Sequence, residues 1–491
     1  MSAASAGLGD RIAAVLALDP DAHAIESGGR WRSWGELAAT VESVAAELRA
    51  GTRIGVLLRN RPAQVAMLLG ALRAGACVVA IDPQRGRERV RREIASLDLP
   101  CIAGAPEDLA SLVAPEVAAT ALAASDVGGA VERVRDAQPC DRPARPGVAV
   151  QMLTSGTTGP PKRIDLSYEM LARSLSGAKH YETKRDAALR LRSGVAIISA
   201  PLVHVSGLFR VLQCVTDGRA FALLERFSVD GWVDAVRRHR PATASLVPAA
   251  LRMVLEAGVA PADLGSIRSV VSGTAPLSPA DADAFLAKYG IPVLASYGAT
   301  EFGGGVAGWN LADHRQFWTA KRGSVGRAHP GCELRVVAPE SGELLDADAE
   351  GLLEVKAAQL GNGGAWVRTT DLARIDADGF LWILGRADQA IVRGGFKVHP
   401  EHVCAALERH PRVRGAAVVS RPDARLGRVP VAAVELRSGE APVTPQDLLE
   451  HASASLARYE LPVEIRIVDA LPRTSSAKVD LAAVSALFAE A

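Results

Sequence analysis

Leu153-Thr154-Ser155-Gly156-Thr157-Thr158-Gly159-Pro160-Pro161-Lys162 is a loop sequence rich in glycine and hydroxyl side chains. It directly follows residues 148–152, an apolar run that predicts a buried strand. In such a loop, glycines let backbone N–H groups approach an anion, hydroxyls donate hydrogen bonds and the lysine adds positive charge. The loop is therefore predicted to bind phosphate groups, with a flexible Ser/Gly turn as the alternative. Its G-x-x-G-x-x-K spacing differs from the Walker pattern G-x-x-x-x-G-K-[ST], which argues against a Ras-like or kinase-like site.

Strand-like and helix-like stretches alternate on both sides of this loop. Apolar runs that predict strands occupy residues 54–58, 77–81, 148–152, 195–199, 244–247, 269–272 and 293–295. Helical spacing occupies residues 34–50, 62–73 and 279–289. This alternation predicts an α/β fold with mostly parallel sheets, in which ligands bind at the carboxyl ends of strands. Residues 98–146 have a weaker pattern and are predicted to be peripheral.

The sequence pattern changes beyond Gly385. A helix is predicted at residues 403–409 and strands at residues 416–420, 431–436 and 463–468. Thr444-Pro445 predicts the start of another helix, with Asp447 three residues after the capping threonine. These elements predict a separate α+β unit of about 100 residues. The chain is therefore expected to divide into residues 1–386 and residues 387–491.

The composition excludes several classes of protein. The chain has 491 residues, and 56 Lys and Arg against 55 Asp and Glu give a net charge of +1. No nucleic acid or anionic membrane is therefore an expected partner. The six cysteines form no C-x-x-C pair, so neither a zinc site nor a disulfide framework is expected. The apolar residues 65–81 contain Arg73 and Gly75, which predicts a buried helix and strand instead of a membrane span.

The expected location and assembly follow from what the sequence does not contain. The first residues lack the pattern of a signal peptide, so a cytoplasmic protein is expected. No coiled-coil heptad is visible, and the oligomeric state stays open.

Three further segments carry side chains suited to chemistry. The first segment directly follows the strand at 293–295 and reads Ser296-Tyr297-Gly298-Ala299-Thr300-Glu301. It offers an aromatic ring to stack on a base, a hydroxyl to bind a phosphate and a carboxylate to bind a divalent cation. The alternative is a capped turn. Asp371 and Arg386 could both hydrogen-bond a ribose, with a surface hairpin as the alternative. Lys478 lies near the C-terminus, where a lone lysine is usually a solvated one.

Taken together and in this order, the four segments resemble the motifs of the adenylate-forming superfamily, which includes acyl-CoA synthetases, aryl-CoA ligases, the adenylation domains of nonribosomal peptide synthetases and firefly luciferase. The resemblance extends from Trp31 to Lys478. It implies a large N-terminal domain of layered α/β subdomains, residues 1–386, that binds ATP and a carboxylic acid. It also implies a small mobile α+β C-terminal domain, residues 387–491, that acts as a lid. ATP, Mg²⁺ and coenzyme A are the implied cofactors and co-substrates.

The resemblance further implies a role for each motif residue. The phosphate loop would bind the β- and γ-phosphates through Thr154, Ser155, Gly156, Thr157, Thr158, Gly159 and Lys162. The adenine would be bordered by Gly273, Thr274, Ala275 and Pro276, and by Ser296, Tyr297, Gly298 and Ala299, with the Tyr297 ring stacked on it. Thr300 would contact the α-phosphate, Glu301 would hold Mg²⁺, and Asp371 and Arg386 would bind the ribose hydroxyls. Asp388 would be the hinge, and Lys478 would bridge the acyl carboxylate and the α-phosphate.

The thiol and acyl sites are implied in the same way. Pantetheine would run along Gly394, Gly395, Phe396 and Lys397. His204 would gate the thiol tunnel, although a packed core histidine is an equal alternative. The acyl pocket would be lined by Val205, Ser206, Gly207, Phe209, Phe302, Gly303, Gly304 and Val306. Members that activate amino acids place an aspartate in the segment that begins at residue 201, and no aspartate occurs here before residue 215. The expected substrate is therefore a carboxylic acid without an amino group, which is aliphatic, aryl or polycyclic.

Four residues depart from the family pattern: Arg163, Tyr168, Thr370 and Ala477. Arg163 is expected to crowd the phosphate loop, and Ala477 to restrict Lys478, so adenylation is expected to be slow. The leading function is an acyl-CoA ligase. The alternatives are a ligase that loads an acyl carrier protein, an enzyme specialised for the thioester-forming half-reaction, and a non-catalytic nucleotide-binding relative. The presence of the acidic and basic motif residues argues against the last of these.

Overall fold

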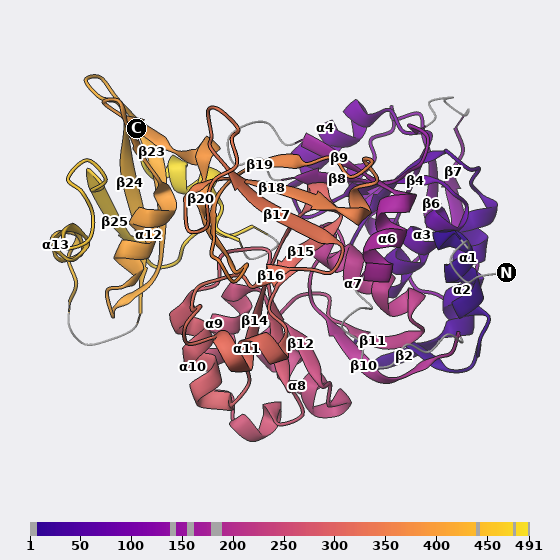
Figure 1. Ribbon diagram of the computed structural model, residues 1–491. Coiled ribbons are helices and arrows are strands. Elements are labelled where there is room, and N and C mark those ends of the chain that lie inside the picture. The colour runs from indigo at the N-terminus through magenta and orange to yellow at the C-terminus, as the bar shows by residue number, and fades with distance from the viewer. Residues whose placement is uncertain are drawn as a thin grey trace.

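The computed structural model describes residues 7–137, 144–154, 162–177, 189–437, 442–474 and 478–489. The strands of these residues form five sheets, with helices packed around them (Figure 1). The helices are α1 (Leu8–Leu16), α2 (Trp34–Ala46), α3 (Pro62–Arg73), α4 (Arg87–Leu97), α5 (Pro106–Leu112), α6 (Tyr168–Gly177), α7 (Val205–Thr216), α8 (Val229–His239), α9 (Pro248–Glu256), α10 (Pro279–Tyr289), α11 (Leu311–Phe317), α12 (Pro400–Glu408), α13 (Pro445–Ser453) and α14 (Leu481–Ala486).

The first two sheets are built largely from parallel pairs. A seven-stranded sheet has the order β7-β6-β5-β3-β4-β8-β9 and a four-stranded sheet the order β10-β11-β1-β2. Their strands are β1 (His23–Ser27), β2 (Arg30–Ser33), β3 (Arg53–Leu57), β4 (Cys77–Ile81), β5 (Cys101–Gly104), β6 (Thr120–Ala123), β7 (Glu132–Arg135), β8 (Val148–Thr154), β9 (Lys162–Ser167), β10 (Arg192–Ile198) and β11 (Arg219–Leu223). The expectation that residues 98–146 are peripheral is wrong, since β5 and β6 are buried strands of the seven-stranded sheet. Short strands buried on both faces lack the alternation that would reveal them.

The third sheet changes from parallel to antiparallel pairing at β14. Its order is β12-β13-β14-β15-β16, with β12 (Thr243–Ser245), β13 (Ser269–Ser272), β14 (Val293–Ala299), β15 (Gly304–Gly308) and β16 (Arg327–Ala328). The fourth sheet is entirely antiparallel and comprises β17 (Cys332–Val337), β18 (Gly351–Ala357), β19 (Val367–Ile375) and β20 (Leu381–Arg386). The expectation of mostly parallel sheets therefore holds only up to β14.

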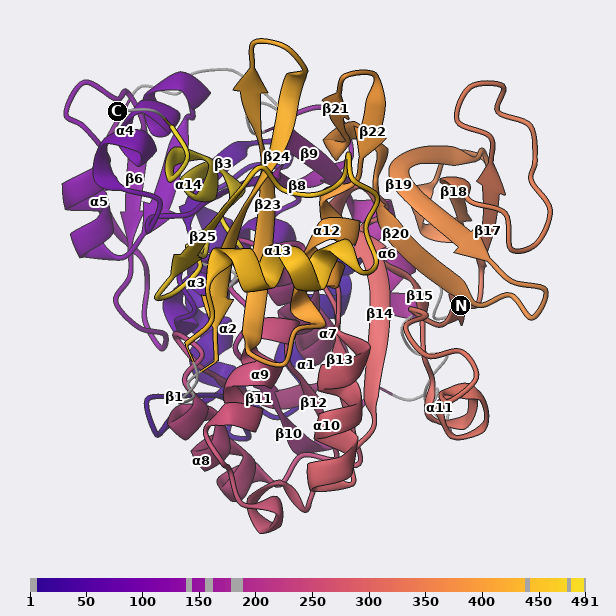
Figure 2. The same ribbon diagram turned by 90° about the vertical axis from the view of Figure 1, so that its left-hand side faces the viewer.

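The last elements form a C-terminal unit, defined here as β21 to α14. Its sheet has the order β22-β21-β24-β23 with β25 beside β24, and its strands are β21 (Ile391–Arg393), β22 (Phe396–Val398), β23 (Val413–Asp423), β24 (Gly427–Leu436) and β25 (Glu464–Val468). Two hydrophobic clusters between Ile391 and Phe488 form its own core. The unit covers one side of the molecule in Figure 1 and faces the viewer in Figure 2. A capping box between Thr444 and Asp447 begins α13, as the sequence predicts.

The boundaries of several elements match the sequence closely. Residues 62–73, 77–81, 269–272 and 279–289 are α3, β4, β13 and α10 as predicted. The helix predicted at 34–50 ends at Ala46, and the strand predicted at 293–295 continues to Ala299 because β15 pairs with its second half. None of the helices in the described ranges is long and apolar enough to cross a membrane.

Candidate active site

The ends of two neighbouring strands bring the motif at residues 296–301 together with Gly273. β13 and β14 run parallel, and Gly273 directly follows β13; a Cβ at this position would lie only 3.0 Å from the carbonyl oxygen of Ser296. A Cβ on Gly298 would lie 2.3 Å from the carbonyl oxygen of Gly304, so only glycine lets β14 pair with β15 here. Thr274 has φ +71°, a strained conformation for a β-branched residue. This close packing fixes both predicted adenine-bordering segments side by side.

Tyr297 and Asp371 are in direct contact. The Tyr297 hydroxyl donates a hydrogen bond to the Asp371 carboxylate. Burial of the Tyr297 ring, together with the neighbouring Asp371 charge, raises the pKa of Tyr297, and burial also raises the pKa of Asp371. A desolvated carboxylate next to an aromatic ring is typical of a ligand-binding position.

Arg386 lies opposite Asp371 in the β19–β20 ladder. Its guanidinium donates to Asp388 with Nε···Oδ1 3.0 Å and Nη2···Oδ2 2.8 Å, and its Nη2 lies 2.8 Å from the Thr370 hydroxyl oxygen. Asp388 lies in the short 3₁₀ turn η5 (Ala387–Gln389). The structure thus brings the two predicted ribose residues together and ties the predicted hinge to one of them, with Thr370 as an added acceptor.

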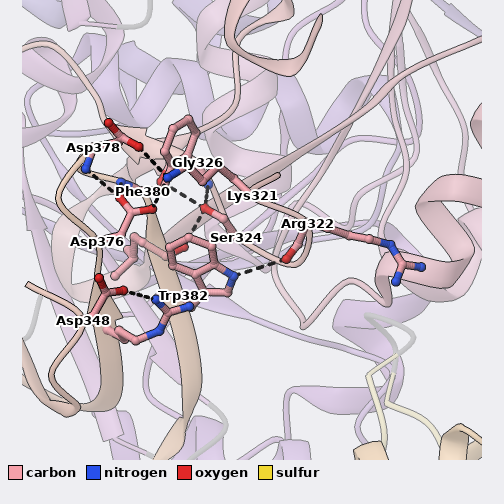
Figure 3. A network of polar contacts seen from close by, with 11 residues as sticks. Lys321, Arg322, Ser324, Gly326, Asp348, Asp376, Asp378, Phe380 and Trp382 are labelled. Carbon is pink, nitrogen blue, oxygen red and sulfur yellow. Dashed lines mark hydrogen bonds and ion pairs between the residues drawn. The ribbon is translucent and has the colours of Figure 1, made fainter. Parts of the chain in front are cut away.

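A polar network anchors the turn at the other end of this hairpin (Figure 3). Lys321 Nζ lies 2.8 Å from Asp376 Oδ2 and 2.5 Å from Asp378 Oδ2. The Ser324 hydroxyl donates to the Leu381 carbonyl (2.9 Å) and accepts from the Gly326 amide (2.9 Å). The hairpin that carries Asp371 and Arg386 is therefore held against residues 321–326.

Ser324 provides a test of this anchor. Its side chain is buried, and alanine would leave the buried Gly326 amide without this acceptor. Ser324→Ala is expected to lower the free energy of unfolding by about 1–3 kcal/mol, measured by urea denaturation. Ser341→Ala, at an exposed turn serine, should change it by less than about 0.5 kcal/mol. Equal stability of the two variants would contradict the proposed anchoring role.

His204 and Lys478 come together although they lie far apart in the sequence. His204 is the N-cap residue of α7, and its buried Nε2 has no hydrogen-bond partner among the residues whose positions are described. Burial, and then the Lys478 charge, lower the pKa of His204 to about 4. Desolvation also lowers the pKa of Lys478, although part of its side chain remains exposed. Within the described residues its ammonium forms no ion pair, which leaves the charge available to an anionic ligand.

The lowered pKa of His204 predicts a pH effect on stability. An unfolded histidine has a pKa near 6.5, so between roughly pH 4 and pH 6.5 the unfolded state binds more protons at this position. The free energy of unfolding should therefore fall as the pH decreases through this window, by up to about 3 kcal/mol from His204. Urea unfolding at several pH values should show a shallower slope for His204→Asn. Identical slopes would contradict the burial of a neutral imidazole.

Glu301 is the predicted metal-binding residue. It lies in the 3₁₀ turn η3 (Thr300–Phe302), its side chain is exposed, and it forms no hydrogen bond or ion pair with the described residues. No cluster of three potential metal ligands occurs among the residues with described positions. A single free carboxylate fits Mg²⁺, which usually takes one or two protein carboxylates together with substrate phosphates and water.

The phosphate loop joins two antiparallel strands. Thr154 and Lys162 are paired at the ends of β8 and β9. Ser155, Gly156, Thr157, Thr158 and Gly159 lie outside the described residues, as does Ala477. Their predicted roles stay predictions.

The Arg163 guanidinium is held by groups of α4, β4 and β8. Its guanidinium donates to the carbonyl oxygens of Ala80 (3.0 Å) and Gln151 (3.3 Å) and pairs with Glu93. The expectation of added charge at the phosphates is corrected, because these partners hold the guanidinium at α4 and β4. Tyr168 likewise has a local structural role, since its hydroxyl donates to the Ala76 carbonyl at 2.7 Å.

The predicted acyl-site residues divide into two groups. Val205, Ser206, Gly207 and Phe209 lie on α7, and a Cβ at Gly304 would be 3.9 Å from the Phe209 ring. Phe302 and Val306 are instead buried in the core of the antiparallel sheet. Two α6 residues pack against this segment: a Cβ at Gly303 would meet Met170 at 2.5 Å and the Ser174 hydroxyl at 3.5 Å. No motif marks them, because only tertiary packing brings α6 to this segment.

The predicted pantetheine segment is the β21–β22 turn of the C-terminal unit. Gly394 and Gly395 form the turn, Lys397 is exposed, and the exposed Phe396 ring stacks on Tyr459 with centroids 4.8 Å apart. The unit thus carries this turn and Lys478 on different elements.

The sequence of this chain matches the patterns of two known families. The sequence pattern of AMP-binding enzymes matches residues 12–363, and that of the AMP-binding enzyme C-terminal domain matches residues 403–478. The chain belongs to the AMP-binding enzyme family. This AMP-binding enzyme is 30% identical to indoleacetate–CoA ligase of Aromatoleum aromaticum, over 94% of each chain. It is 28% identical to 4-coumarate–CoA ligase 1 of Oryza sativa subsp. japonica, over 90% of this chain and 84% of the relative.

Solved structures show the same fold. ATP-bound MatB from Rhodopseudomonas palustris superimposes with a TM-score of 0.81 at 24% identity, covering 98% of this chain and 99% of MatB. Apo MatB gives a TM-score of 0.69 at 25% identity, covering 98% of each chain. Both comparisons show that this AMP-binding enzyme has the fold of MatB.

Proposed function

We propose that this AMP-binding enzyme is an AMP-forming ligase that activates a non-amino carboxylic acid with ATP and transfers the acyl group to CoA. The observation that carries the proposal is the desolvated ammonium of Lys478, which lies beside the buried His204 and forms no ion pair among the described residues. The contacts among Tyr297, Asp371 and Arg386 support a nucleoside-binding role for these three residues. The similarity to indoleacetate–CoA and 4-coumarate–CoA ligases supports this reaction class.

The geometry of the strand ends supports a set of proposed nucleotide contacts. Tyr297 stacks on the adenine, and Asp371 and Arg386 accept and donate hydrogen bonds at the ribose hydroxyls. Thr300 meets the α-phosphate, and Thr154 and Lys162 begin and end the loop that holds the β- and γ-phosphates. Glu301 is the residue that would hold Mg²⁺, which would neutralise phosphate charge.

The first half-reaction brings two anions together. An acyl carboxylate oxygen attacks the α-phosphorus of ATP, the P–O bond to the β-phosphate breaks, and pyrophosphate leaves. Catalysis therefore requires fixed positive charge and oriented donors at the developing negative charge. The Lys478 ammonium supplies this charge, and its desolvation strengthens the interaction.

The second half-reaction requires another lid position. Rotation of residues 387–491 about Asp388 withdraws Lys478 and brings Gly394, Gly395, Phe396 and Lys397 toward the thiol path. The CoA sulfur then attacks the acyl carbon, the acyl–phosphate bond breaks and AMP leaves. Burial lowers the pKa of His204 to about 4, so the imidazole is neutral at pH 7 and would gate the thiol path as an uncharged ring.

The test combines pyrophosphate release and thioester formation in one panel. Aliphatic, aryl and polycyclic acids are each incubated with ATP, Mg²⁺ and either CoA or phosphopantetheinylated carrier proteins, with synthetic acyl-adenylates in parallel. Pyrophosphate and acyl-CoA from a free acid support the proposal. Thioester from preformed adenylates alone would favour the half-reaction enzyme, and acylated carrier alone would identify a carrier protein as the acceptor.

A further inference from the structure

A chain of ion pairs links α9 to the segment that carries Lys478. Arg414, on β23 of the C-terminal unit, contacts Glu256 at the end of α9 with Nε···Oε1 2.9 Å and Nη2···Oε2 2.5 Å. Its third nitrogen, Nη1, lies 2.5 Å from Glu435 Oε1 on β24. Arg414 therefore connects a carboxylate of the N-terminal part of the chain with a carboxylate inside the C-terminal unit.

Glu435 is a buried carboxylate that holds the start of the Lys478 segment. It is only 2% exposed, and its Oε2 accepts a hydrogen bond from the Leu471 amide at 2.9 Å. The Thr474 amide donates to the Lys478 carbonyl at 2.8 Å, which fixes Lys478 next to the residues that follow Leu471. A buried charge that loses its partner is costly, so Arg414 and the Leu471 amide stabilise Glu435 together.

A second contact places α9 against the same arginine. Arg252, one turn before Glu256, donates to the Arg414 carbonyl at 3.2 Å and is itself held by Asp281, with Nε···Oδ2 2.5 Å. The Arg414 and Glu256 side chains are about one-third exposed, at 34% and 33%. The Glu256 contact can therefore break at small cost, whereas the Glu435 contact lies within one unit and persists.

We propose that Arg414 and Glu435 are positioning residues for Lys478. Docking of Arg414 on Glu256 sets the C-terminal unit in the orientation for adenylation, and Glu435 keeps the Lys478 segment in place within that unit. The inference rests on the proposed function, because it assigns the adenylation step to Lys478. Arg414 thus makes two contacts with different roles. Its contact with Glu256 can be released when the C-terminal unit moves, and its contact with Glu435 is permanent.

The test compares the two half-reactions in Glu256→Gln and Glu435→Gln. Adenylation is measured by ATP–pyrophosphate exchange with the best acid, and thioester formation by CoA with the matching synthetic acyl-adenylate. Glu256→Gln should slow exchange about two- to five-fold, as expected for a partly exposed ion pair, and leave the second step unchanged or faster. Glu435→Gln should slow exchange about ten-fold and speed hydrogen exchange of the Leu471 amide.

A matched control is Glu464→Gln, which removes ion pairs with Arg421 and Arg466 inside the same unit. It should change neither half-reaction. Equal slowing of both half-reactions in Glu256→Gln, or unchanged exchange in both test variants, overturns the inference. If the wild-type enzyme shows no exchange with any acid, the proposed function fails; faster Leu471 amide exchange in Glu435→Gln would still support the anchor, and an unchanged rate would overturn it.

Discussion

Replacing Lys478 with alanine is expected to slow acyl-adenylate formation about 10²–10³-fold, by analogy with deleting one donor that stabilises charge in a transition state. The reason is local: within the described residues the Lys478 ammonium has no ion-pair partner, and it is the lysine whose charge reaches His204. The measurement is ATP–pyrophosphate exchange with the best acid.

The same variant should keep its second half-reaction. Thioester formation from a synthetic acyl-adenylate and CoA should remain within about two-fold of wild type, because that step does not use the adenylation charge. Lys288→Ala, at an exposed lysine whose Nζ donates to the Leu255 carbonyl, should leave both steps unchanged. A parallel loss of both steps in Lys478→Ala would assign the lysine a structural role instead.

Replacing Asp371 with asparagine is expected to raise KM for ATP about 10–100-fold, the value of a hydrogen bond to a charged group. The amide side chain would keep the shape of the carboxylate but lose the charge that accepts from Tyr297 and the ribose, and the ring would lose its fixed orientation. Initial rates at varied ATP and saturating acid measure the effect.

The KM for the carboxylic acid should be nearly unaffected by the Asp371→Asn change. KM for the acid should stay within about two-fold, because Asp371 is proposed to touch the nucleoside only. Asp348→Asn is the control, since Asp348 is an exposed carboxylate that pairs with Arg374 on the same hairpin. An equal rise of both KM values would contradict a ribose-specific role.

Much of the fold is readable from sequence where local pattern and tertiary structure agree. The proline-initiated helices α3 and α10 and the strands β4 and β13 have the predicted bounds, because their apolar residues and end signals lie within one segment. β5 and β6 were misjudged since their burial depends on neighbours distant in sequence. The antiparallel end of β14 was missed for the same reason, as its partner is the glycine-rich β15.

In the candidate site, too, the sequence predicts which residues take part but not which distant residues they contact. The identity of Tyr297, Asp371 and Arg386 could be predicted from motif order, and the structure brings them together. Their mutual contact could not, nor could the proximity of His204 to Lys478, because both depend on packing between distant segments. Arg163 shows most clearly what the sequence could not predict. Its position in the sequence is next to the phosphate loop, but its guanidinium is held by the Ala80 carbonyl and by Glu93.

The separate hydrophobic core of the C-terminal unit has a consequence for recombination between relatives. A segment that carries its own core can be exchanged as a cassette without opening the core of the rest of the chain. The graft must still match the host where the two meet, and here that means an arginine able to take the place of Arg414 opposite Glu256 and Arg252. Chimeras joined just before Ile391 that keep this match should activate acids better than chimeras that break it.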